Sequence, residues 1–155
     1  MAAKTHFKRI GRELAMQFLF QYNLNQEEFN PEDLDRFFDQ MDQSDVFDDS
    51  RELRRGKKYT AKLVAGIIEN IDSIDEKINE FISKEWDWAR IAAVDKGILR
   101  VATYEMLYEE GVPPIVAINE AVELAKRFGS DQSKRFINGL LNNLKNTLDR
   151  DPRGD

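Results

Sequence analysis

The most apolar segment of the chain, 89-ARIAAVDKGILRVATYEMLYEE-110, decides the fold. Its apolar side chains recur with a period of about 3.6 residues, so they predict a helix from about Trp88 to Glu110. They surround nearly the whole of this helix: Ile91, Val94, Ile98, Leu99, Val101, Ala102, Met106 and Leu107. A helix that is apolar on nearly every side must be covered by other elements, so we expect it in the middle of the fold.

Four amphipathic helices are predicted on the N-terminal side of this segment. They run from about Lys4 to Asn23, over a short stretch that begins at Asn30, from about Arg51 to Asn70, and onward from Ser73. Two of them have recognisable starts. In 30-NPED-33 the asparagine can cap the helix and the proline suits its first position, while 73-SIDE-76 has the spacing of a capping box.

On the C-terminal side, 110-EGVPP-114 ends the central helix, because proline cannot continue one. Two amphipathic runs follow in 117-AINEAVELAKRFGSDQSKRFINGLLNNL-144. Gly129 stands where a helix C-terminus favours a residue able to adopt positive φ, and Ser130 or Asp131 can cap the next helix. No segment alternates apolar and polar residues as a strand does. The predicted fold class is therefore all-α, with about seven helices.

The composition excludes several classes of function. The chain has no cysteine and one histidine, so disulfides, thiolate metal sites and thiol nucleophiles are excluded. It also lacks the common phosphate-binding, metalloprotease and hydrolase motifs. We therefore predict no catalytic residue, no metal and no cofactor. No apolar run approaches the roughly 20 residues that span a bilayer, and no signal peptide is recognisable, so we expect no membrane partner and a cytoplasmic location.

The charge is unevenly distributed along the chain. The formal net charge is −6, yet residues 1–12 carry Lys4, Lys8, Arg9 and Arg12 and no acid. Residues 27–52, by contrast, hold eleven acids. A chain polarised in this way can bind an anion at one end while its net charge keeps it soluble. The alternative is that these are merely solvated helix faces of opposite sign.

The junction between the last two helices is also basic. Lys126, Arg127, Lys134 and Arg135 lie close to it in the sequence. On a helical wheel at about 100° per residue, Phe136 lies at the margin of the stripe of apolar residues that the last helix buries. Gln132, Gly139 and Asn143 share its flank, and Arg135 lies beside it.

An aromatic ring, an amide and a guanidinium thus share a flank that Gly139 leaves open. These groups are the ones with which proteins bind single-stranded RNA, since bases stack on rings, amides read base edges and cations hold phosphates. The alternative is that Phe136 packs on a neighbouring helix and that Lys126 and Arg127 only complement a helix C-terminus.

Three stretches resemble the NusB family of bacterial transcription antitermination factors: 11-GRELAMQFLFQYNL-24, 95-DKGILRVATYEMLY-108 and 112-VPPIVAINEAVELAKRFGSDQSKRFINGLLNNL-144. The resemblance covers about Lys8 to Leu148. It implies two small three-helix bundles packed into one domain over residues 1–148, no enzymatic activity, and a tail over 149–155 that we expect to be disordered. The implied partners are the NusE ribosomal protein, boxA-type single-stranded RNA of nascent ribosomal RNA transcripts, and the RNA polymerase elongation complex with other Nus factors.

The resemblance also assigns roles to residues. The basic start of the family matches Lys8, Arg9 and Arg12, and its RNA-facing corner matches Gln132, Arg135 and Phe136; by charge, Lys4 and Lys134 complete the predicted RNA-binding set. The predicted NusE-facing residues are Phe20 and Asp95. Two departures from the family act in opposite directions. Ile10 and Gly11 interrupt the basic run, whereas Gln132 replaces an acid of the family.

Two other functions remain open on the sequence. The first is a protein-interaction module whose acidic surface engages a basic ribosomal protein while only that partner touches RNA. The second is an RNA-modifying enzyme, because a related helical domain is fused to some RNA methyltransferases; since the sequence ends before a cofactor-binding domain, we do not expect catalysis. The free protein is either a monomer or a homodimer.

Overall fold

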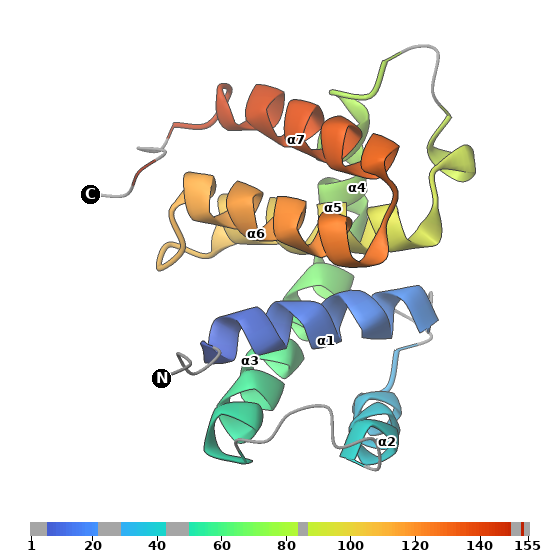
Figure 1. Ribbon diagram of the computed structural model, residues 1–155, viewed down its shortest axis with the longest axis vertical. Coiled ribbons are helices and arrows are strands. Elements are labelled where there is room, and N and C mark those ends of the chain that lie inside the picture. Colours follow the sequence, from blue (N-terminus) through green and yellow to red (C-terminus); the bar gives the residue numbers. More distant parts are fainter. Residues whose placement is uncertain (1–5, 22–28, 43–49, 84–86, 150–152, 154–155) are drawn as a thin grey trace. The chain divides into compact units, whose positions relative to one another are not determined.

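The computed structural model describes residues 6–21, 29–42, 50–83, 87–149 and 153. Within these ranges it contains seven α-helices, one short 3-10 helix and no strand, so the predicted all-α class is confirmed (Figure 1). The elements are α1 (Phe7–Gln21), α2 (Pro31–Asp42), α3 (Ser50–Glu69), α4 (Ile71–Asn79), η1 (Trp88–Arg90), α5 (Ala93–Tyr108), α6 (Pro114–Phe128) and α7 (Asp131–Lys145). None of the described helices is long and apolar enough to cross a membrane.

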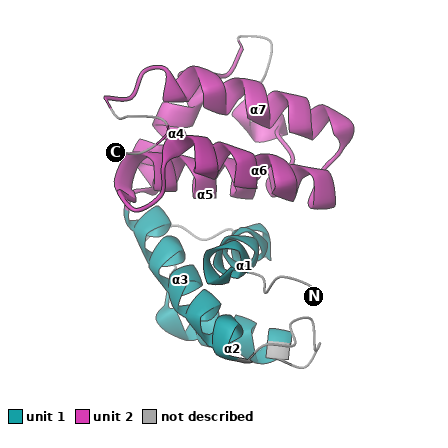
Figure 2. Ribbon diagram, turned by 60° about the vertical axis from the view of Figure 1, so that its left-hand side comes forward, with its two compact units in different colours: residues 1–69 teal, residues 70–155 magenta. Residues whose placement is uncertain are grey.

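The chain divides into two compact units, residues 1–69 and residues 70–155 (Figure 2). The first contains α1, α2 and α3, and the second contains α4 to α7 with η1. In the second unit α5 packs against α4, α6 and α7. Ile98, Leu99 and Met106 of α5 are completely buried. Because α5 contacts all three other helices of its unit, its predicted central position is confirmed within this unit.

In the first unit, α1 and α3 approach closely at two glycines. A Cβ atom on Gly11 would lie 2.9 Å from the carbonyl oxygen of Gly56, and one on Gly56 would lie 2.7 Å from Cγ2 of Ile10. The hydroxyl of Thr60 on α3 donates to the Gly11 carbonyl at 3.0 Å and so joins the two helices. The glycine that interrupts the basic run of α1 is therefore a packing residue.

The start of α2 is as predicted, and that of α4 is not. Asn30 accepts a hydrogen bond from the Glu32 backbone N–H at 3.0 Å, and its own N–H donates to Asp33 at 3.2 Å. The predicted capping box at Ser73 is wrong, because α4 begins at Ile71 and Ser73 lies inside it. Starting at Ile71 adds this half-buried side chain to the apolar stripe that continues with Ile74 and Ile78.

The central helix α5 begins five residues later than predicted, at Ala93 instead of about Trp88. Residues 88–90 form η1, whose first turn is capped by Asp87 through a hydrogen bond of 3.1 Å from the Ala89 N–H. The backbone of Ile91 and Ala92 is then extended. These two residues separate the capped turn of η1 from α5, so the predicted single helix is divided in two.

Candidate nucleic-acid interface

The corner between α6 and α7 is held by short polar side chains. Ser130 caps α7, as predicted, by accepting a hydrogen bond of 3.0 Å from the Ser133 N–H. The hydroxyl of Ser133 donates to Oδ2 of Asp95, 2.9 Å away in the first turn of α5. The hydroxyl oxygens of the two serines are 3.0 Å apart. These bonds fix the start of α7 to the start of α5.

Gly129 precedes this cap, and the prediction of a positive φ there is wrong. Its backbone is extended, with φ −106° and ψ −165°. Space explains the glycine instead, because a Cβ atom would lie 2.9 Å from Cβ of Ser133 and 3.0 Å from the carbonyl oxygen of Ala125. A larger residue would therefore push α7 away from the end of α6.

A cavity of about 220 Å³ opens at this corner. It is lined by Arg90, Ile91, Ala92, Asp95, Ser130, Gln132, Ser133 and Phe136. The Phe136 side chain is half-buried at this cavity, while Gln132, Lys134 and Arg135 are exposed. A Cβ atom on Gly139 would meet nothing within 4 Å, so the flank is sterically open as the wheel predicts. The Phe136 ring, the Gln132 amide and the Arg90 guanidinium thus line one small cavity, and Lys134 and Arg135 lie next to its lining residues in the sequence.

The carboxylate of Asp95 is the unusual group in this cavity. The residue is 8% exposed, and its Oδ1 is buried and accepts no hydrogen bond from any described residue. Burial raises the pKa of Asp95 above its ordinary value of 3.8, and the hydrogen bond from Ser133 only partly offsets this. The site therefore keeps a poorly solvated acceptor atom at the wall of a cavity.

Asp95→Asn should stabilise the protein at neutral pH. A raised pKa in the folded state means that the ionised carboxylate opposes folding above that pKa, and that this cost disappears below the unfolded-state pKa. The gain in Tm of the variant should therefore be largest near pH 7 and shrink as the pH falls towards about 4. Thermal melts of both proteins across this pH range measure it. A variant less stable than the parent at pH 7 would show that the Ser133 bond requires the charge.

The predicted basic residues of the first unit differ in exposure. Arg9 is exposed, and Lys8 is half-buried with its Nζ 5.7 Å from the ring centre of Tyr59. Arg12 is only 5% exposed, and its guanidinium lies 6.0 Å from the same ring. The helical spacing of Lys8, Arg9 and Arg12 predicts that they share the side of α1 opposite its apolar stripe. This prediction is wrong for Arg12, because α1 is buried over more of its surface than the stripe indicates. Lys4 lies outside the described residues.

The two predicted partner residues lie in different surroundings. Phe20 of α1 is 53% exposed, as a residue at a protein interface would be. Asp95 belongs instead to the cavity at the α6–α7 corner, where it joins Phe136 and Gln132. The helical wheel of α7 could not reveal this grouping, because it does not show which residues of α5 face that helix.

The fold and this corner define a class of protein: a small chain of two units, helical over its described elements, with a corner cavity edged by an aromatic ring, an amide, an arginine and an aspartate. Among the described residues, no three histidine, aspartate or glutamate side chains are arranged to hold a metal ion. The model of the NusB family matches residues 9–146. The chain therefore belongs to the NusB family, as its sequence predicts.

Individual relatives agree with this assignment. The chain is 42% identical over 141 residues to the transcription antitermination proteins NusB of Bacillus cereus (strain B4264) and Bacillus thuringiensis (strain Al Hakam), covering 91% of this chain and 98% of each relative. Among solved structures, NusB of T. maritima superposes with a TM-score of 0.73, at 32% identity and 94% coverage of both chains. A crystal structure of the antitermination factors NusB and NusE in complex with dsRNA has a TM-score of 0.70 at 20% identity, covers 92% of this chain and 98% of that one, and shows the same fold.

Proposed function

We propose that this protein is a non-enzymatic transcription antitermination factor that pairs with the NusE ribosomal protein and binds boxA-type RNA of nascent ribosomal RNA transcripts. The observation that carries the RNA part is the corner cavity, which is lined by the half-buried Phe136 ring and by exposed Gln132, with exposed Arg135 next to Phe136 in the sequence. The relationship to proteins named for antitermination supports the cellular role. The known complex of a NusB with NusE and dsRNA supports the choice of partners.

In this proposal each group at the corner has its own task. One base stacks on the ring of Phe136, the amide of Gln132 bonds to a base edge, and Lys134 and Arg135 hold phosphates. Lys8 and Arg9 of α1, with Lys4 as a further predicted contact, bind the backbone of the same RNA, whereas Arg12 is too buried to contact it directly. Phe20 contacts NusE, and Asp95 is the second predicted NusE contact. Residues 1–148 act as one domain in the cytoplasm, and the RNA polymerase elongation complex with other Nus factors is the wider assembly. The tail expected over residues 149–155 lies mostly outside the described residues.

Titration of boxA-type RNA with the protein, alone and with NusE, across a salt series tests the proposal. If about four phosphates are neutralised, the logarithm of the affinity should fall with the logarithm of salt concentration with a slope near −3, at roughly 0.7 per phosphate of a single strand. Neutralising Lys8 and Arg9 together should flatten this slope. No binding by the isolated protein at low salt, together with unchanged binding by that variant in the complex, would favour the protein-interaction module that leaves RNA to its partner.

Light scattering tests the state of the free protein. A homodimer that hides the partner surface should dissociate when NusE is added, whereas a monomer should show only the mass of the new complex. Loss of the dimer upon replacement of exposed Phe20 by alanine would place the dimer contact on the surface that we assign to NusE.

A further inference from the structure

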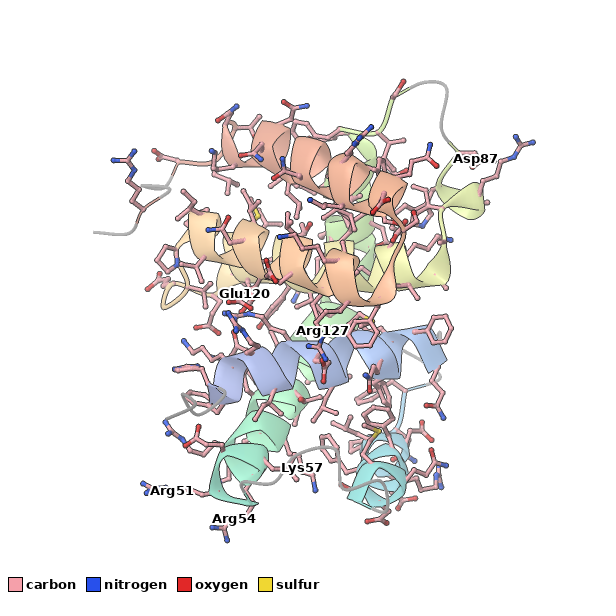
Figure 3. The ribbon with its side chains drawn as sticks, in the orientation of Figure 1. Arg51, Arg54, Lys57, Asp87, Glu120 and Arg127 are labelled. Atoms are coloured by element: carbon pink, nitrogen blue, oxygen red, sulfur yellow. The ribbon has the colours of Figure 1, made fainter. Side chains whose placement is uncertain are left out.

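The first half of α3 carries a dense group of cations that the proposed function does not use. The segment 51-RELRRGKKYTAK-62 contains six basic residues and one acid, Glu52. Arg51, Arg54, Lys58 and Lys62 follow one another at spacings of three or four residues, so they lie on one side of the helix. All four are exposed, and Figure 3 shows Arg51 and Arg54 extending outward from α3. We call these four residues the α3 basic stripe.

At least part of the α3 basic stripe is available to bind a ligand. Arg54 and Lys58 form no hydrogen bond or ion pair with any described residue, while the carboxylate of Glu52 lies 3.7 Å from Arg55 beside the stripe. Like charges one helical turn apart repel each other and lower the stability of the helix by a few tenths of a kcal/mol per pair. A polyanion that neutralises Arg54 and Lys58 therefore relieves the repulsion between these two side chains.

The stripe lies in the same compact unit as the basic end of α1, on a different side of α3 from the residues that contact α1. The guanidinium carbon of Arg55 is 4.1 Å from the ring centre of Phe7, and that ring packs edge-on against Tyr59 at 6.2 Å. The close contact of Gly11 with Gly56 fixes the two helices at the same place. The cations of α3 thus belong to the same compact unit as Lys8 and Arg9, and their placement does not depend on how the two units are arranged.

The composition of the stripe favours a nucleic-acid backbone over a protein as its ligand. Protein interfaces are built around buried apolar or aromatic anchors. The large hydrophobic side chains that the described residues expose lie on other helices, namely Phe20, Tyr108, Ile115, Val116 and Phe128. The backbone of RNA, by contrast, is bound by Lys and Arg side chains without apolar contacts. The stripe offers only such side chains.

We propose that the α3 basic stripe is a second RNA-binding surface, which holds backbone phosphates of the transcript in addition to those bound at the α6–α7 corner. This inference rests on the proposed function, because it assumes that the protein binds RNA at all. The stripe contains no amide or aromatic side chain that could read or stack a base, so it binds without sequence preference. Its contribution to the affinity grows with the length of the RNA and falls with salt.

The test compares two RNAs and two double variants of the full chain. The RNAs are a boxA-type oligonucleotide of about 12 nucleotides, near the size of one single-strand site, and the same sequence embedded in an unstructured RNA of about 40 nucleotides. The test variant is Arg54→Ala with Lys58→Ala. The control variant is Arg36→Ala with Lys77→Ala, which removes the same charge outside the stripe. Circular dichroism confirms that each variant is folded.

With the long RNA, the test variant should lose affinity roughly tenfold at low salt, and its salt slope should fall by about 1.4, or 0.7 for each lost phosphate contact. The short RNA should bind the test variant and the parent equally, and the control variant should behave as the parent with both RNAs.

An unchanged slope of the test variant on the long RNA would overturn the inference and leave an acidic protein as the ligand of the stripe. An equal loss of affinity in the control variant would show that the effect follows from net charge alone. That result would also overturn the inference. If the parent bound neither RNA, both the inference and the proposed function would fall.

Discussion

Gly11→Ala should destabilise the protein by about 1–3 kcal/mol. The added methyl group would lie 2.8 Å from Cδ2 of Tyr59 and 2.9 Å from the carbonyl oxygen of Gly56, and the second of these is a backbone atom that cannot rotate aside. Relief requires α1 to move away from α3, which lengthens the 3.0 Å hydrogen bond from Thr60 to the Gly11 carbonyl. Alanine gains about 1 kcal/mol of helix propensity over glycine, so the clash must exceed that gain. Urea unfolding followed by circular dichroism measures the difference.

Gly139→Ala is the matched control for this prediction. Gly139 also lies inside a helix, but a Cβ atom there would meet nothing within 4 Å. The propensity gain is then unopposed, and the variant should be more stable than the parent by about 0.5–1 kcal/mol. The two substitutions are chemically identical, so opposite signs isolate the close approach of α1 and α3. A Gly11→Ala variant that is as stable as the Gly139→Ala variant would show that the two helices separate without cost.

The glycines show what can be predicted from the sequence and what cannot. The apolar period predicts that α1 and α3 exist, because periodicity is a property of each helix alone. It does not predict that Gly11 meets Gly56, because that depends on where two helices cross. In the sequence Gly11 is only a gap in a run of cations, whereas in the structure it is the place where α1 can approach Tyr59.

Some features of the candidate site could likewise be predicted from the sequence, and others could not. The cap at Ser130 and the open flank beside Gly139 follow from local spacing, and both are confirmed. The grouping of Asp95 with Phe136 was missed, because it requires the relative position of α5 and α7. The extended residues Ile91 and Ala92 were missed for a different reason. They lie within an apolar period that continues through η1 into α5, and such a period does not show that the backbone is extended at two residues inside it.

Phe136→Ala should weaken binding of boxA-type RNA by about 1–3 kcal/mol, which corresponds to roughly 5- to 150-fold in affinity. The ring is half-buried at the edge of the cavity, so the part that faces the cavity can support one stacked base. Phe136→Trp should retain most of the affinity, because a larger ring offers the same kind of stacking surface. Fluorescence anisotropy with labelled RNA at fixed salt measures the three proteins, since affinities for RNA are comparable only at equal ionic strength.

Phe128→Ala is the matched control for the loss of an aromatic ring at this corner. Phe128 ends α6 and is exposed, its ring lies 4.9 Å from the guanidinium carbon of Arg127, and it does not line the cavity. Its replacement should leave the RNA affinity within about twofold of the parent, because no stacking surface of the cavity is lost.

Thermal melts decide between the two interpretations of Phe136. A large fall in Tm of Phe136→Ala with unchanged RNA affinity would make Phe136 a packing residue between helices. A loss of affinity at nearly constant Tm would make the cavity edge a base-stacking surface, and the open flank at Gly139 would then be the side from which the RNA enters.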